Sequence, residues 1–178
     1  MPKDNIEKAV KKGQGANEGD FQSATYEGYG AGGVAVYVEC MTDNLNRTVS
    51  GVRHIFSKYG GNLAKSGSLD FLFTRQCLFI LGEDQNINED QELILIDAGA
   101  TDIVIEENIT HIIGSFGSFG TLQKQLEGMD LAIDSAEAIR SPLNTIDLDA
   151  QIKHKVLGLL SALEDNEDVQ RTSHNMAD

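Results

Sequence analysis

Residues 28–33, with the sequence GYGAGG, are the first stretch whose residue types and spacing could do chemistry, because they match the GxGxxG pattern of dinucleotide-binding loops. That pattern holds a pyrophosphate only when a strand leads into it and the N-terminus of a helix follows. Here the run that follows, Val34–Cys40, is apolar and β-branched and indicates a buried strand. No GK[ST] sequence occurs, which excludes a P-loop. We therefore expect no cofactor, and we interpret the glycines as loop residues that adopt positive φ or pack closely.

The other reactive residue types do not form a catalytic or metal-binding pattern. The four histidines are scattered without an HExxH spacing, and no GxSxG motif is present. Cys40 and Cys77 are too few for a disulfide framework, and either could be an ordinary buried thiol. The segment Gly114–Gly120 could hold an anion at its amides, but a connector with Phe116 and Phe119 in the core is favoured. We predict no catalytic residue and no metal, and hence no enzyme.

The segment TDNLNRT, Thr42–Thr48, gathers polar side chains around the start of a predicted helix, although capping a helix requires only one of them. A patch that combines phosphate contacts with stacking could form from Arg47, Arg53, Lys58 and Lys65, with Tyr26 and Tyr29 nearby in sequence. A capped helix with a solvated basic face is an equally good interpretation from the residues alone. The candidate binding residues are Lys3, Lys8, Lys11, Lys12, Tyr26, Tyr29, Asn44, Asn46, Arg47, Arg53, Lys58 and Asn62.

The charge of the chain is unevenly distributed along the sequence. The 178 residues carry a net charge of −14. Residues 1–75 contain nine Lys and Arg against eight Asp and Glu, whereas residues 76–178 contain five against twenty. An anionic partner is therefore expected at the N-terminal part. The acidic remainder serves solubility or docks a basic protein partner.

The N-terminal half predicts a short amphipathic helix over 1–13, a linker over 14–23 and then the first domain. Apolar residues spaced by three and four from Leu45 to Tyr59 indicate the clearest helix, with Asp43 or Asn44 as its cap and Gly60-Gly61 as its end. Leu69–Phe73 and Cys77–Leu81 follow as two strands, or as one long strand interrupted at 74–76.

The acidic part begins with an ambiguous segment and continues with clearer ones. Glu89–Ala98 suits a strand by its LILI run and a helix by its flanking Asn and Gly, and we predict a helix. When the strand Cys77–Leu81 is included as the first element, this part of the chain has the predicted order βαββαβ, which is the ferredoxin-like pattern. Its further elements are strands at 102–105 and 110–113 that form a hairpin, a helix at 118–127 and a strand at 131–139.

The tail predicts one more helix, marked by Ile152 to Leu163, and a strand at 168–174. This pair has no partner of its own, so we expect it to return to the first domain. The predicted organisation is a discontinuous α/β domain of residues 24–76 and 148–178, with a ferredoxin-like domain of residues 77–147 inserted in it.

Several motifs resemble the YebC/PmpR family, which includes the mitochondrial translational activator of cytochrome c oxidase. The resemblance extends over essentially the whole chain, and the stretches that carry it are residues 1–13, 26–30 (YEGYG), 32–36 (GGVAV), 42–48 (TDNLNRT), 52–62 (VRHIFSKYGGN) and 164–170 (EDNEDVQ). The resemblance implies an α+β fold with two ferredoxin-like α/β domains, the second inserted into the first. It also implies that 1–13 is a short helix left from a missing basic helical domain.

The resemblance further implies a cytoplasmic regulator of gene expression without catalytic activity. Members of the family are described as probable transcriptional regulators that bind DNA, and some as ribosome-associated factors that relieve stalling. The expected partners are therefore DNA, or the ribosome and RNA, with no membrane. A protein-interaction module that uses its acidic domains without touching nucleic acid is the third possibility.

Overall fold

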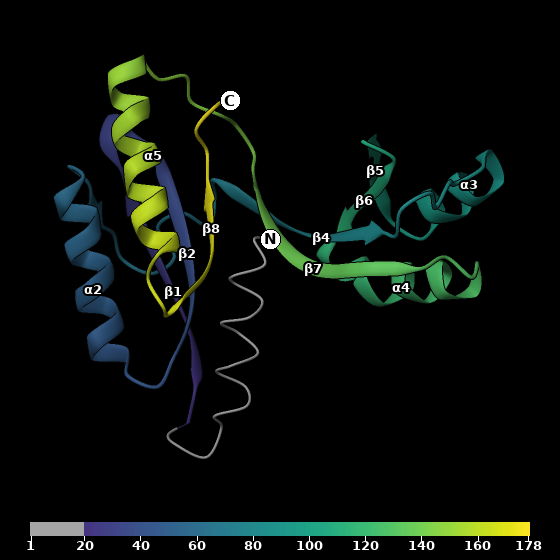
Figure 1. Ribbon diagram of the computed structural model, residues 1–178, viewed down its shortest axis with the longest axis horizontal. Helices are drawn as coiled ribbons and strands as arrows, with labels where there is room; N and C mark the ends of the chain where they lie inside the picture. Colours follow the sequence, from purple (N-terminus) through teal and green to yellow (C-terminus); the bar gives the residue numbers. More distant parts are fainter. Residues whose placement is uncertain (1–19) are drawn as a thin grey trace. The chain divides into compact units, whose positions relative to one another are not determined.

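The computed structural model describes residues 20–178, which fold into two compact units (Figure 1). Unit 1 contains residues 20–73 and 142–178, and unit 2 contains Thr74–Ser141. Each unit is a four-stranded sheet with two helices, so the α+β class predicted from the sequence is confirmed. The predicted helix over 1–13 lies outside the described residues.

Unit 1 has the strand order β3-β1-β2-β8. β2, α2 and β3 form a βαβ unit, and β1 lies between its two strands, which is the split βαβ arrangement of ferredoxin-like sheets. The β1 strand comes first in the chain and pairs antiparallel with both neighbours. The elements of this unit are β1 (Gln22–Tyr29), η1 (Ala31–Gly33), β2 (Ala35–Thr42), α2 (Leu45–Lys58), β3 (Asn62–Leu63), α5 (Ala150–Glu164) and β8 (Val169–His174).

The central strand β2 is buried on both faces, which explains its continuous apolar sequence. Val36 and Val38 pack with residues of α2 and α5, while Ala35 and Tyr37 face the other side, where Leu69 and Phe73 cover them. The covering segment is held by Glu27, a carboxylate only 3% exposed, which accepts hydrogen bonds from the backbone N–H of Gly67 at 2.7 Å and of Leu69 at 2.6 Å.

Unit 2 has the order β5-β6-β4-β7 and the βαββαβ chain order predicted for it. Both helices cover the same face of the sheet, because Leu95, Leu122 and Leu126 share one core with Cys77 and Phe79. The elements are β4 (Phe73–Leu81), α3 (Glu89–Asp97), β5 (Ala100–Glu106), β6 (Ile109–Ser115), η2 (Phe116–Ser118), α4 (Phe119–Gly128) and β7 (Ile133–Pro142).

Three local predictions were wrong or incomplete. Leu69–Leu72 is a series of turns rather than part of a strand, because the Glu27 carboxylate accepts the Leu69 backbone N–H; β4 begins at Phe73 and runs unbroken through 74–76. The strand β1 was not predicted, since its largely polar sequence lacks the usual alternation. Phe116 is 39% exposed instead of buried, and its ring lies 3.9 Å from the guanidinium carbon of Arg75.

Other predictions about local structure are confirmed. Glu89–Asp97 is a helix whose start is a capping box: the Asn88 side chain accepts from the Gln91 N–H and the Gln91 side chain accepts from the Asn88 N–H. Gly32 and Gly33 have φ of 71° and 78°, the conformation expected of glycines in a tight loop. Cys40 and Cys77 are both buried, and burial raises the pKa of Cys77.

His174 gives unit 1 a predictable sensitivity to acid. Its Nδ1 accepts a hydrogen bond from the Met176 N–H at 3.3 Å, and burial lowers the pKa of the imidazole, an effect that Asp178 and Glu164 oppose. The unfolded chain therefore binds a proton at His174 at a higher pH than the folded chain. Stability linked to this residue is complete above about pH 6.5 and is lost as the pH falls below that value. When the pH is lowered from about 7.5 to about 5.5, we expect the melting temperature of His174→Gln to fall less than that of the natural chain. Equal losses would contradict this role.

Candidate nucleic-acid interface

The helix α2 carries four of the candidate side chains, Asn46, Arg47, Arg53 and Lys58, and its two ends are fixed by its own sequence. Asn44 accepts a hydrogen bond from the Arg47 N–H at 3.0 Å and caps the first turn. At the other end, the Gly61 N–H donates to the Phe56 carbonyl at 2.8 Å and the Gly60 N–H to the Ser57 carbonyl at 3.2 Å. This pair of bonds is a Schellman motif, and it returns the chain directly into β3.

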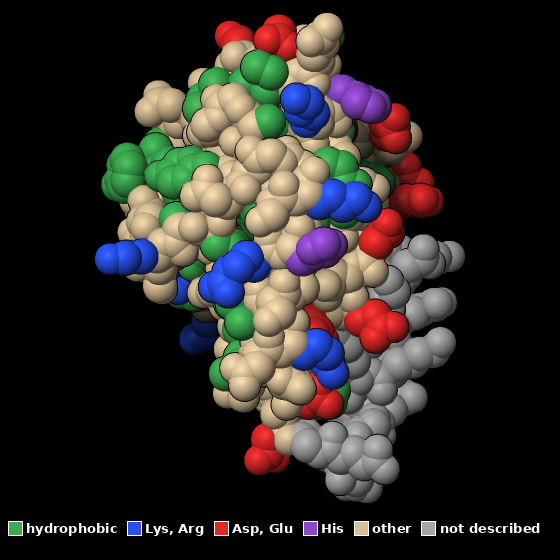
Figure 2. Space-filling model, turned by 90° about the vertical axis from the view of Figure 1, so that its left-hand side faces the viewer, with side chains coloured by type: hydrophobic (Ala, Val, Ile, Leu, Met, Phe, Trp, Pro, Cys, Tyr) green, Lys and Arg blue, Asp and Glu red, His purple; other side chains and the backbone are tan. Residues whose placement is uncertain are grey.

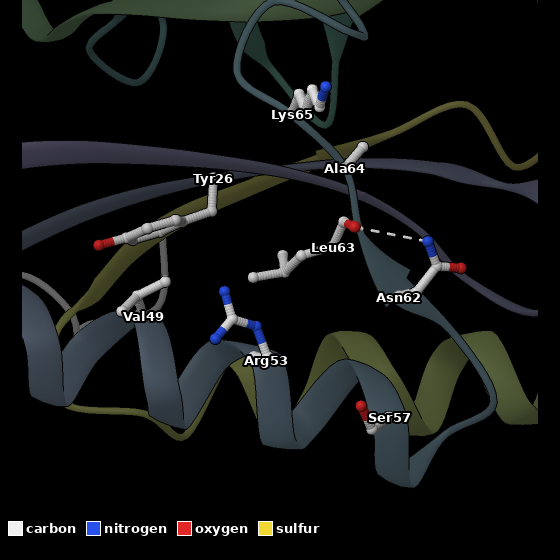
Figure 3. A pocket seen from close by; sticks show the side chains of 8 residues that line it. All are labelled: Tyr26, Val49, Arg53, Ser57, Asn62, Leu63, Ala64 and Lys65. Atoms are coloured by element: carbon white, nitrogen blue, oxygen red, sulfur yellow. Dashed lines mark hydrogen bonds between the residues drawn. The ribbon is translucent and has the colours of Figure 1, made fainter.

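A hollow of about 410 Å³ lies between α2, the strand β1 and the segment that begins with β3 (Figure 3). The Arg53 guanidinium projects from α2 toward the Tyr26 ring and Leu63, while Lys65 lies at the far end of the hollow. The side chains that line it are Tyr26, Val49, Arg53, Ser57, Asn62, Leu63, Ala64 and Lys65, and none of these described residues is acidic.

The hollow combines positive charge with a partly apolar wall. Arg53 and Lys65 are exposed, so their charges are available to a ligand. Burial, and more weakly Cys40 and Asp168, raise the pKa of Tyr26, so its phenol stays neutral near pH 7 and can donate a hydrogen bond. Val49 and Leu63 form the apolar part of the lining. Such a surface can accept a phosphate at its cations and a flat ring against its aromatic and aliphatic side chains.

Two glycines allow β3 to approach close enough to form one wall of the hollow. A Cβ added at Gly28 would lie 2.8 Å from the Asn62 carbonyl oxygen and 2.6 Å from the Phe56 ring. A Cβ added at Gly61 would overlap the Tyr29 carbonyl oxygen. The pairs Gly28↔Leu63 and Tyr29↔Asn62 therefore depend on the absence of a side chain at Gly28 and Gly61, and so does the position of Asn62 in the lining of the hollow.

Arg47 lies apart from the hollow in an ion-pair network. Its Nη2 donates to the Asp43 carboxylate at 2.9 Å and to the Asp168 carboxylate at 3.0 Å, and hydrogen bonding to Asp168 raises the pKa of the guanidinium. Thr48 donates to the same Asp168 carboxylate at 2.8 Å. Two carboxylates thus compensate the Arg47 charge, and the residue joins the start of α2 to the entry of β8.

A second hollow, of about 340 Å³, lies beside this network and has the opposite character. It is lined by Arg47, Gly51, Asp165, Asn166, Glu167 and Asp168. Three carboxylates against one guanidinium make it unfavourable for a phosphate. Of the two hollows, only the one that contains Arg53 suits an anionic ligand.

The structure brings together three of the candidate residues, namely Tyr26, Arg53 and Asn62. Tyr29 packs on the opposite face of the sheet, against the cluster of Ala35 and Tyr37. Asn44 caps α2, Asn46 is exposed on its first turn, and Lys58 lies 5.6 Å from the centre of the Tyr59 ring. The remaining candidates, Lys3, Lys8, Lys11 and Lys12, lie outside the described residues.

Sequence reasoning named the charged residues of the hollow but not its apolar lining. Val49 was interpreted only as one of the repeating core positions of the helix, and Leu63 belongs to a two-residue strand that has no sequence signal.

Figure 2 looks at the side of unit 1 that carries α2 and shows Lys and Arg side chains along this face, with Asp and Glu mainly toward its edges.

Comparison with known proteins places this geometry in a family. Residues 21–176 match the family model described as the second and third domain of TACO1/YebC. The chain belongs to the TACO1/YebC family. A probable transcriptional regulatory protein of Amoebophilus asiaticus is 48% identical over 180 residues, which cover 99% of this chain and 74% of the relative. A protein of the same description from Porphyromonas gingivalis is 42% identical and is covered to 73% of its length.

A solved structure similar to this chain supports the fold. The crystal structure of a conserved hypothetical protein from Aquifex aeolicus has a TM-score of 0.77 and 39% sequence identity, covering 99% of this chain and 74% of that one. The curated relatives of this TACO1/YebC chain are named as regulators of transcription rather than as enzymes. Among residues 20–178, no helix combines the length and apolar character needed to cross a membrane.

Proposed function

We propose that this chain is a cytoplasmic DNA-binding regulator of transcription of the YebC type, and that the hollow beside Arg53 contacts the nucleic acid. The observation that supports this proposal is the pairing of an exposed guanidinium with the neutral Tyr26 ring in a hollow whose described lining has no carboxylate. The acidic excess of the chain lies elsewhere: unit 2 holds three Lys and Arg against thirteen Asp and Glu. A phosphate backbone would approach the side of lowest repulsion.

The apolar part of the hollow also favours an unpaired base as the group that is bound. A duplex presents its phosphates and groove edges, whereas a single strand can place a base against an aromatic ring. The second candidate function, action on ribosomal or messenger RNA as a translation factor, uses the same contacts. The relative affinities of the chain for duplex DNA, single-stranded DNA and RNA distinguish the two candidates.

Removing the cations of the hollow tests the proposal. We expect Arg53→Ala to weaken binding to a labelled oligonucleotide by about tenfold and Lys65→Ala by about threefold, each lowering the slope of log affinity against log salt by about 1. Fluorescence anisotropy at about 50 mM salt measures both quantities.

Lys124→Ala is the matched control, because it removes one exposed cation from α4 in unit 2. Its affinity is expected to match that of the natural chain. If the natural chain binds no DNA or RNA at low salt, or if Lys124→Ala loses as much as Arg53→Ala, the proposed interface is wrong.

A further inference from the structure

The helix α3 exposes apolar side chains that its own unit does not cover. Leu93, Ile94 and Ile96 are 61%, 44% and 50% exposed, and Leu95 is the one buried residue of the helix. An amphipathic helix of this length would place its aliphatic residues together on the core side. Three exposed aliphatic side chains within four residues instead indicate a surface that another molecule covers.

Two of these side chains, Leu93 and Ile96, form one continuous face of the helix together with acidic side chains. Residues three and four apart are neighbours on a helix, and this spacing links Leu93 and Ile96 to Glu89, Glu92 and Asp97. All five are exposed. We call this face, defined by Glu89, Glu92, Leu93, Ile96 and Asp97, the α3 ridge.

The charge around the α3 ridge has a single sign over a long stretch of chain. Between Arg75 and Lys124 the sequence contains nine Asp and Glu and no Lys or Arg. The acidic side chains of the ridge therefore have no basic neighbours along the chain. Their field attracts a cationic partner and repels an anionic one.

We propose that the α3 ridge docks a cationic amphipathic helix of another protein, with the partner's apolar side against Leu93 and Ile96 and its Lys or Arg side chains over Glu89, Glu92 and Asp97. Helix-on-helix contacts of this kind use anchors at i and i+3 or i+4, the spacing that Leu93 and Ile96 have. A second copy of this chain is disfavoured, because two acidic ridges would face each other. Nucleic acid is disfavoured for the same reason.

Two synthetic peptides of about 18 residues test the proposal on the whole chain. One has leucines on one helical side and lysines on the others, and the second has the same composition in scrambled order. Both carry the same charge, so only the first can present an apolar side to the ridge. We expect the amphipathic peptide to bind at least about tenfold more tightly by isothermal titration calorimetry at about 150 mM salt.

The double variant Leu93→Gln with Ile96→Gln should remove this difference between the two peptides. Glutamine keeps the helix propensity and leaves Leu95 in the core, so circular dichroism should show unchanged folding. Leu157→Gln, which changes a leucine 49% exposed on α5 in unit 1, is the matched control and should bind like the natural chain.

Replacing Glu89 and Glu92 with glutamine should weaken the binding of both peptides and lower its dependence on salt. Equal binding of the two peptides, or an unchanged preference in the double variant, would overturn the proposal. A natural chain that sediments as a dimer, and becomes a monomer in the double variant, would overturn it in favour of a second copy.

Discussion

Replacing Asp168 with alanine is expected to lower the free energy of unfolding of unit 1 by about 2 kcal/mol, the cost of removing a buried charged acceptor. The carboxylate is 5% exposed and accepts hydrogen bonds from the Thr48 hydroxyl at 2.8 Å and from the Arg47 guanidinium at 3.0 Å. Its removal takes away the buried acceptor that the Thr48 hydroxyl and the Arg47 guanidinium share, and leaves them with Asn44 and Asp43 among their remaining acceptors. Because this carboxylate joins the first turn of α2 to the residue before β8, the variant loses contacts between residues that are far apart in the sequence.

The four tyrosines of the chain make this measurement specific to unit 1. Tyr26, Tyr29, Tyr37 and Tyr59 all belong to unit 1, and the chain has no tryptophan. Urea unfolding followed by tyrosine fluorescence therefore reports unit 1 alone. Asp43→Ala is the matched control, since Asp43 binds the same guanidinium from an exposed position and should cost less than about 1 kcal/mol. Equal costs for the two variants would show that burial of Asp168 contributes nothing.

Elements set by neighbouring residues could be predicted from the sequence. Asn44 and Gly60 mark the ends of α2 by bonds within four residues of each, and the spacing of Val52 and Phe56 marks its buried side. The hairpin of β5 and β6 follows from apolar runs on either side of a short polar turn. In each case the stabilising contacts join residues that are also close along the chain.

Contacts between distant residues could not be predicted in the same way. The carboxylate that binds Arg47 is 121 residues away, and the backbone groups that bind the Glu27 side chain are 40 and 42 residues away. Arg47 therefore resembled a free cation, and Leu69–Phe73 resembled a strand. The hollow could not be predicted for the same reason, because Tyr26 and Asn62 come to line one hollow only when β1 and β3 pair.

Gly61→Ala is expected to lower the free energy of unfolding of unit 1 by about 3 kcal/mol, at the upper end of the cost of overpacking. Its added methyl group would overlap the Tyr29 carbonyl oxygen and lie 3.1 Å from the Gly30 Cα, and both of these are backbone atoms. Backbone paired within a sheet cannot rotate away as a side chain can, so β3 must move from β1.

Gly60→Ala separates this steric effect from the effect of backbone conformation. Gly60 has a φ of 78°, and nothing lies within 4 Å of a Cβ added there, so alanine should cost about 1 kcal/mol of strain alone. Tyrosine fluorescence in urea compares the two variants. The movement of β3 also displaces Asn62 and Lys65 from Arg53, so Gly61→Ala should bind nucleic acid more weakly than Gly60→Ala at a temperature at which both are folded. Equal binding by the two folded variants would show that the position of β3 does not affect the affinity for nucleic acid.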